Sequence, residues 1–201
     1  MKLYYYPGAC SLSPHIVAQE AGIPLQLEKV DLRSHKTESG EDFYAVNPKG
    51  YVPALKLDDG TTLTEGPAIV QYLADQKPQS GLAPANGTFA RYKLQEWLTF
   101  INSEIHKSFG PLFASSPEDV KKDAIAKIAK RFAYVEKHLQ GKQFITGDDF
   151  TVADAYFFVM LTWAHNFKID LASYPDISAY FARIAARPGV RAAMKAEGLV
   201  K

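Results

Sequence analysis

A stretch rich in proline and glycine, from Lys77 to Gly87, divides this chain of 201 residues into two halves with different sequence patterns. Its composition is typical of a linker between domains. Before it, short strand-like and helical segments alternate, whereas nearly every segment after it has the apolar spacing of a helix. We therefore expect an α/β domain over residues 1–80 and an all-α domain over residues 87–201.

The first half predicts the order βαβ and then ββα, which is that of a thioredoxin-like unit. Ser13-Pro14 and Gly66-Pro67 are start signals, which predict helices capped by Ser13 and by Gly66. Asp59-Gly60 is a strong hairpin signal. The expected strands cover residues 2–6, 25–30, 54–57 and 61–63; the expected helices cover about 13–22, a short piece around Phe43 and about 66–76; residues 31–40 are expected to be loop.

The second half predicts helices through apolar spacing and start signals. Ser116-Pro117 predicts a helix capped by Ser116, and Thr151-Val152-Ala153-Asp154 reads as a capping box before a central core helix. Pro175 and Pro188 begin two last short helices. Two apolar faces repeat at helical spacing: Leu94, Leu98, Ile101 and Ile105, and then Ile128, Phe132, Val135 and Leu139.

Composition and charge exclude several classes of protein. The chain has 23 Lys+Arg against 22 Asp+Glu, which gives no general electrostatic argument for a nucleic-acid or membrane partner. The N-terminus lacks the features of a signal peptide, and the most apolar later stretch, residues 153–164, is too short to span a bilayer. A single cysteine suits a reducing compartment, so we expect a cytoplasmic protein. The five histidines have no metal-ligand spacing, so no metal is predicted.

Cys10 is the only cysteine, and it lies between the first expected strand and a helix. Backbone N–H groups and the helix dipole at such a position favour an anion, so a thiolate near Cys10 would be stabilised. The spacing Cys-x-x-Ser suits mixed-disulfide or thiol-transfer chemistry better than dithiol redox. The alternative is a small buried apolar residue, but the position of Cys10 favours the functional interpretation.

Two further segments of the first half suggest recognition of a peptide. Val52-Pro53 is a candidate cis bond that would leave the Val52 backbone able to pair with an extended peptide, although from these residues alone an ordinary turn is the better interpretation. The helix start at Gly66 favours a carboxylate, and Glu65 beside it would attract an ammonium group. A free amino-acid end carries both charges. A helix start with a solvated glutamate explains Glu65 and Gly66 equally well.

One segment of the second half interrupts an apolar helix face with polar residues. Glu104, His106 and Lys107 would line a cleft, but taken alone they are typical of a solvated helix face. Trp163, on the later core helix, suits packing better than a site.

These segments, in this order, resemble the cytosolic glutathione transferases, specifically the bacterial beta class, over essentially the whole chain. The motifs that carry the resemblance are Met-Lys-Leu-Tyr-Tyr-Tyr-Pro-Gly-Ala-Cys-Ser-Leu-Ser, Val-Asn-Pro-Lys-Gly-Tyr-Val-Pro-Ala-Leu, Leu-Thr-Glu-Gly-Pro-Ala-Ile-Val-Gln-Tyr-Leu-Ala-Asp, Glu-Ile-His-Lys-Ser-Phe and Phe-Thr-Val-Ala-Asp-Ala-Tyr.

The resemblance implies a homodimeric enzyme that conjugates the glutathione thiolate to small hydrophobic electrophiles, with thiol–disulfide exchange through Cys10 as a further activity. Glutathione is then a cosubstrate, and Cys10 and His106 are the catalytic residues. The residues implied to bind glutathione are Ser11, His35, Lys36, Tyr51, Val52, Pro53, Glu65, Gly66, Thr99, Ser103, Glu104 and Lys107, and those implied to line the hydrophobic-substrate pocket are Tyr5, Phe109 and Trp163.

The chain departs from the family pattern at two positions. His35 stands where the family often has lysine, with Lys36 adjacent, and Thr99 stands where it often has asparagine. One alternative is a glutathione-dependent thiol transferase or reductive dehalogenase with Cys10 as covalent nucleophile. Another is a non-catalytic protein that binds ligands or partners, against which the presence of Cys10, Val52-Pro53 and Glu65 together argues. The natural electrophile stays open, as does the role in detoxification, aromatic degradation or redox repair.

Overall fold

The computed structural model describes residues 1–201, which form two compact units. One unit comprises residues 1–83 together with 186–201, and the other comprises residues 84–185. The first boundary lies in the predicted linker. The second boundary was not expected: residues 186–201 belong to the first unit, whereas the sequence placed them in the helical domain. No helix in the chain combines the length and the apolar character needed to cross a bilayer.

The first unit has the predicted thioredoxin-like order. Its strands are β1 (Lys2–Tyr5), β2 (Gln26–Asp31), β3 (Lys36–Thr37), β4 (Ala54–Lys56) and β5 (Thr62–Thr64). Its helices are α1 (Leu12–Ala21), α2 (Phe43–Val46), α3 (Gly66–Gln76), the short 3₁₀ turn η1 (Pro78–Ser80) and α9 (Pro188–Ala196). The strand order is β3-β2-β1-β4-β5, with β1 parallel to β2 and the other pairs antiparallel. The short strand β3 lies where a loop was expected.

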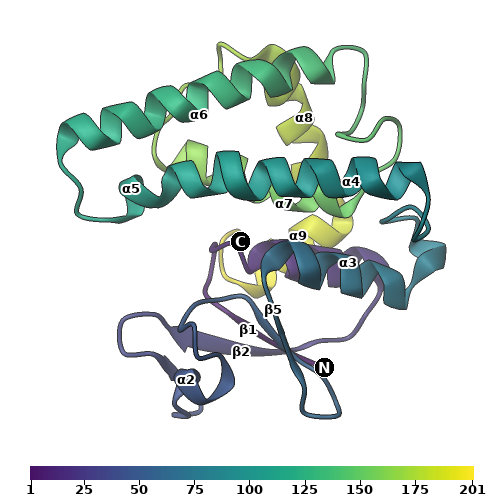
Figure 1. Ribbon diagram of the computed structural model, residues 1–201, viewed down its shortest axis with the longest axis vertical. Coiled ribbons are helices and arrows are strands. Elements are labelled where there is room, and N and C mark those ends of the chain that lie inside the picture. The colour runs from purple at the N-terminus through teal and green to yellow at the C-terminus, as the bar shows by residue number, and fades with distance from the viewer. The chain divides into compact units, whose positions relative to one another are not determined.

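Successive side chains of β1 point to opposite faces of the sheet, and both faces are covered. Tyr4 packs against Phe43 of α2, with 5.6 Å between ring centroids, in a cluster with Val30 and Val52. The neighbouring Leu3 is fully buried on the other face. Figure 1 shows α1 and α3 on the side of the sheet opposite α2, and α9 packs on α1. That packing holds the C-terminal segment in the first unit.

The second unit is entirely helical. Its elements are α4 (Phe89–Phe100), the π-helical turn η2 (Ile101–Ile105), the 3₁₀ turn η3 (His106–Phe109), α5 (Gly110–Phe113), α6 (Glu118–Leu139), α7 (Val152–Asn166) and α8 (Pro175–Ala185). The long helix predicted through Ile105 therefore changes its hydrogen-bonding pattern at Ile101. In Figure 1, α6 runs alongside α4 and α5. Nearly all of α7 is buried, which confirms the predicted central helix.

Three predicted helix caps are wrong by one or two residues. Ser11, not Ser13, stands at the N-cap of α1, while Glu65, not Gly66, stands at the N-cap of α3. Pro117, not Ser116, precedes α6. In each case proline lies near the helix start as expected, but proline is tolerated at more than one position of the first turn. The capping box of Thr151 and Asp154 is confirmed.

Candidate functional site

Cys10 lies in a tight loop that joins β1 to α1. The Ser11 hydroxyl donates to the carbonyl of Tyr6 and accepts from its N–H, at 3.2 Å in both cases. The Ser13 hydroxyl donates to the Cys10 carbonyl at 2.8 Å. The side chain of Ser11 is buried and engaged in this way, so its role here is to hold the loop.

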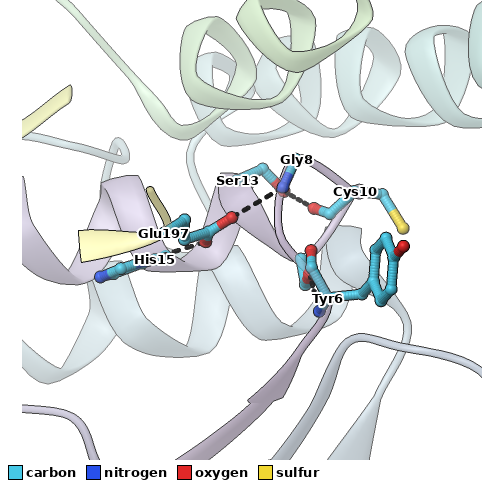
Figure 2. A network of polar contacts seen from close by, with 7 residues as sticks. Tyr6, Gly8, Cys10, Ser13, His15 and Glu197 are labelled. Carbon is cyan, nitrogen blue, oxygen red and sulfur yellow. Dashed lines mark hydrogen bonds and ion pairs between the residues drawn. The ribbon is translucent and has the colours of Figure 1, made fainter. Parts of the chain in front are cut away.

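The C-terminal segment holds the same loop from a second side (Figure 2). The Glu197 carboxylate accepts a hydrogen bond from the Gly8 N–H at 2.9 Å. Its other oxygen lies 2.9 Å from Nδ1 of His15 on α1, and both side chains are almost completely buried. In Figure 2 the Cys10 sulfur points away from this carboxylate. Glu197 therefore fixes the loop without contacting the sulfur.

The Cys10 side chain is a thiol in this environment. Its sulfur donates a hydrogen bond to the Val52 carbonyl at 3.4 Å. Burial raises the pKa of Cys10 to about 12, against the opposing effect of the backbone N–H groups of Cys10 and Ser11. The prediction that this turn stabilises a thiolate therefore does not hold for Cys10 itself. Desolvation of the buried sulfur raises its pKa by more than the backbone N–H groups at the helix start lower it.

Val52 and His35 present groups suited to a bound ligand. The Val52-Pro53 peptide bond is cis, as the sequence suggested, and the Val52 N–H makes no hydrogen bond within the chain. His35 has a left-handed backbone with φ of 53°. Its ring lies against the Tyr44 ring, tilted by 33° with 4.5 Å between centroids, and its buried Nδ1 has no hydrogen-bond partner. Lys36 beside it is exposed on β3.

The start of α3 carries a second group of polar side chains. Glu65 is its N-cap, with φ of 73°, and its side chain makes no capping hydrogen bond. The Glu65 carboxylate instead accepts from the hydroxyl of Tyr51 at 2.9 Å and from the ammonium group of Lys49. Hydrogen bonding to Glu65 raises the pKa of both the Tyr51 hydroxyl and the Lys49 ammonium. Gly66 follows as the first residue of the helix.

The helical unit brings His106 into a chain of side-chain hydrogen bonds. His106 Nδ1 lies 2.5 Å from the Tyr156 hydroxyl, which donates to Asn102 Oδ1 at 2.9 Å. Because the only proton of the Tyr156 hydroxyl goes to Asn102, Nδ1 of His106 is the donor to Tyr156. In a neutral His106 ring, Nε2 is then the nitrogen without a proton.

The other predicted residues of the helical unit lie at different depths. Glu104 Oε2 accepts from Arg131 on α6, at 2.5 Å from Nη2 and 3.2 Å from Nε. Ser103 and Lys107 are exposed. The Thr99 hydroxyl, also exposed, donates to the Gln95 carbonyl at 2.8 Å.

The residues expected to line an apolar pocket are mostly packed. Phe109 is completely buried and Trp163 nearly so, and their ring centroids lie 5.5 Å apart. Phe113, 59% exposed, lies against Trp163 at 4.8 Å and is the accessible member of this group. In the first unit, the half-buried Tyr5 lies 6.5 Å from the His15 ring. A separate cavity of about 210 Å³ contains none of these residues and is lined by Glu96, Trp97, Phe100 and Tyr134.

Comparison with known proteins places these features in a family. Residues 8–76 match the glutathione S-transferase N-terminal domain, and residues 94–188 match the glutathione S-transferase C-terminal domain. Glutathione S-transferase GstA of Escherichia coli O157:H7 is 48% identical over 200 residues, which cover 99% of this chain and 100% of that protein. The chain belongs to the glutathione S-transferase family.

Two solved structures of this family sharpen the comparison. A beta-class glutathione S-transferase of Sphingomonas chungbukensis has 51% identity and a TM-score of 0.97, with 100% of both chains covered. A sphingomonad glutathione S-transferase solved in complex with glutathione has 52% identity and a TM-score of 0.96, again with 100% of both chains covered. The predicted family, class, fold and assignment as a transferase enzyme are confirmed.

Sequence reasoning missed three residues that form ion pairs or hydrogen bonds with predicted site residues of this transferase. Lys49 pairs with Glu65, Arg131 with Glu104, and Tyr156 with His106. Lys49 and Tyr156 both lie inside motifs that carried the family resemblance, so attention to every polar residue of those motifs would have found them. Arg131 lies on a polar helix face with no distinguishing signal. No group of three or more His, Cys, Asp or Glu side chains has an arrangement that would hold a metal ion.

Proposed function

We propose that the protein binds glutathione along the first unit and transfers its thiolate to small hydrophobic electrophiles. The observation that carries this proposal is that Cys10, Val52 and Glu65 come together from three loops of one compact unit: the Cys10 thiol is hydrogen-bonded to the Val52 carbonyl, and the charge of Glu65 contributes to the raised pKa of Cys10. Glutathione is an extended tripeptide with a thiol at its centre, an ammonium group and two carboxylates. These loops offer partners for the thiol, the ammonium group and one of the carboxylates.

The proposed contacts follow from the chemistry of each group. The γ-glutamyl ammonium binds Glu65, and its carboxylate binds the helix start at Gly66. The cysteinyl backbone pairs with Val52 before cis-Pro53. The remaining predicted contacts, Ser103, Glu104, Lys107 and Thr99 of the helical unit and His35, Lys36 and Tyr51 of the first unit, are cations, carboxylates and hydroxyls that complement the charges of glutathione.

The state of Cys10 favours conjugation over covalent catalysis. Because its pKa is raised to about 12, Cys10 stays protonated near neutral pH, and it is a hydrogen-bond donor rather than a nucleophile. We propose that it donates to the glutathione thiolate, which attacks an electrophilic carbon. With an aromatic chloride, a carbon–sulfur bond forms and chloride leaves with the bonding electrons. A thiol transferase or dehalogenase would need Cys10 to ionise before it attacks.

In the helical unit, His106 is the proposed acid–base residue. The Tyr156–Asn102 chain fixes the proton of a neutral ring at Nδ1, so that Nε2 is the nitrogen that accepts a proton. The group of Phe109, Phe113 and Trp163 is the proposed apolar surface for the electrophile, with Phe113 as the exposed part. The class of electrophile is an apolar aromatic compound, because aromatic side chains favour stacked or edge contacts with such rings.

We also propose that the enzyme is a cytoplasmic homodimer. Large aromatic side chains of α4 and α6 are exposed, namely Phe89, Tyr92 and Tyr134, and the cavity beside Tyr134 is lined with aromatic rings. Exposed apolar groups of this kind favour association. Sedimentation equilibrium at micromolar concentration should give twice the mass of the chain, and a monomer there would contradict this part of the proposal.

The test compares two reactions in wild type and Cys10→Ala: conjugation of glutathione to an activated aromatic chloride, and reduction of a glutathione mixed disulfide. We expect conjugation to persist but to fall by about ten- to a hundredfold, since one hydrogen bond to a charged group contributes about 1.5–3 kcal/mol. Disulfide reduction by the wild type should be slow, and what there is should be lost in the variant, because that reaction needs the Cys10 sulfur as the attacking group. If the wild type conjugates nothing and reduces disulfides through Cys10, the thiol-transferase interpretation replaces this one. Flow-through of the wild type on immobilised glutathione would favour the non-catalytic alternative.

A further inference from the structure

Lys49 forms an ion pair with the Glu65 carboxylate, which is the group that the proposed function assigns to the ammonium group of glutathione. Its ammonium pairs with Glu65 Oε1 and also donates to the Thr64 hydroxyl at 3.1 Å. The same Oε1 accepts from Tyr51 at 2.9 Å. Lys49 and Glu65 are each roughly half exposed, so this is a solvent-accessible ion pair that can exchange its partners.

The loop that carries Lys49 is rigidly held. Asn47 is buried; its side-chain oxygen accepts from the Lys49 N–H at 3.1 Å, and its side-chain nitrogen donates to the Tyr51 carbonyl at 2.7 Å. Gly50 has φ of +72°, and a Cβ there would lie 2.6 Å from the Tyr44 ring. Lys49 and Tyr51 are thus placed on either side of a fixed turn, and only the flexible Lys49 side chain needs to move to leave Glu65.

The backbone and the side chain of Glu65 also suit binding to an external partner. Its backbone has φ of 73°, which side-chain-bearing residues rarely adopt, and its carboxylate makes no cap to α3. Such strained positions cost free energy and persist where the surrounding structure imposes them, often at ligand sites. The carboxylate is therefore directed towards its neighbouring loop rather than used to stabilise its own helix.

We propose that Lys49 is the resident counter-ion of Glu65 and that the ammonium group of the γ-glutamyl end displaces it when glutathione binds. This inference rests on the proposed function. The ligand exchanges one ammonium–carboxylate pair for another, and Lys49 returns to solvent. Lys49 thereby sets how strongly the site favours a ligand with an ammonium group. A ligand without that group leaves the Lys49–Glu65 pair intact.

The test measures dissociation constants by calorimetry for two probes. One is glutathione, and the other is its des-amino analogue, in which hydrogen replaces the γ-glutamyl ammonium. Lys49→Met should bind glutathione about two- to fivefold more tightly than wild type, because an exposed ion pair contributes up to about a fivefold factor. It should bind the des-amino analogue no more tightly than wild type. Lys49→Arg, which retains the cation, should behave as wild type.

Lys29→Met is the matched control, since Lys29 is an exposed lysine of β2 in the same unit and its loss changes the net charge equally. It should leave both dissociation constants unchanged. Equal weakening of both probes by Lys49→Met would show that Lys49 contacts the ligand directly and would overturn the inference, as would unchanged affinity for glutathione. If the wild type binds neither probe, the proposed function itself fails.

Discussion

Glu65 and Asp154 are two carboxylates beside helix starts in different units of this protein, and their surroundings are opposite. Asp154 is fully buried and accepts four hydrogen bonds: from the Ile145 N–H, the Thr151 N–H and hydroxyl, and the Tyr180 hydroxyl, at 2.7 to 2.9 Å. Glu65 is half exposed, with an unusual backbone conformation and a lysine as partner.

This difference separates a structural carboxylate from a binding one. Both oxygens of Asp154 are saturated by donors that are themselves buried, so nothing can be exchanged without breaking the network. Glu65 shares one oxygen between a flexible ammonium and a hydroxyl at the surface, so a ligand can replace either partner. The number and burial of the donors, rather than the carboxylate itself, decide the role.

The largest effect is expected from Asp154→Ala. This change leaves several buried donors without acceptors, and we expect the free energy of unfolding to fall by about 3–5 kcal/mol. Urea denaturation followed by circular dichroism measures it. Asp170→Ala is the control, because Asp170 makes comparable local hydrogen bonds while exposed, and it should cost under about 1 kcal/mol. Equal losses in the two variants would refute the buried-network argument.

A smaller effect, on binding rather than stability, is expected from Glu65→Gln. Loss of the charge should weaken glutathione binding about ten- to a hundredfold, the usual range for a charge-assisted hydrogen bond. The free energy of unfolding should change by less than about 0.5 kcal/mol, since the Lys49 pair is exposed. Calorimetric titration and urea denaturation of the same preparation test both statements. Destabilisation comparable to that of Asp154→Ala would erase the distinction between the two carboxylates.

The smallest effect is expected from Glu65→Gly. Glycine adopts positive φ without the steric cost that Glu65 bears, so the free energy of unfolding should rise by about 1 kcal/mol while glutathione binding is weakened. A rise in melting temperature of about 2–4 °C would report it. A lower melting temperature would mean that the Glu65 side chain stabilises the fold, contrary to the role assigned to it.

Local signals predicted much of the architecture correctly. The capping box at Thr151 and the βαβ-ββα order depend on residues only a few positions apart. The cis bond before Pro53, by contrast, was only a candidate on local grounds and was expected from the family resemblance. The helix caps at Ser13, Gly66 and Ser116 were wrong, although they too are local. The hydroxyls near Cys10 hold the loop rather than the helix start, since Ser11 bonds Tyr6 and Ser13 bonds the Cys10 carbonyl.

Sequence by itself determined the family, the two-part fold and the residue types of the site, because motif order and helical or strand periodicity are properties of neighbouring residues. Tertiary structure alone decided the protonation and the hydrogen-bond partners of those residues. The protonation of Cys10 depends on burial beside Val52, 42 positions away, and the loop that carries it is held by Glu197, 189 positions from Gly8. Desolvation and charge pairing act through space, so the same motif yields a thiol or a thiolate according to what the fold packs around it.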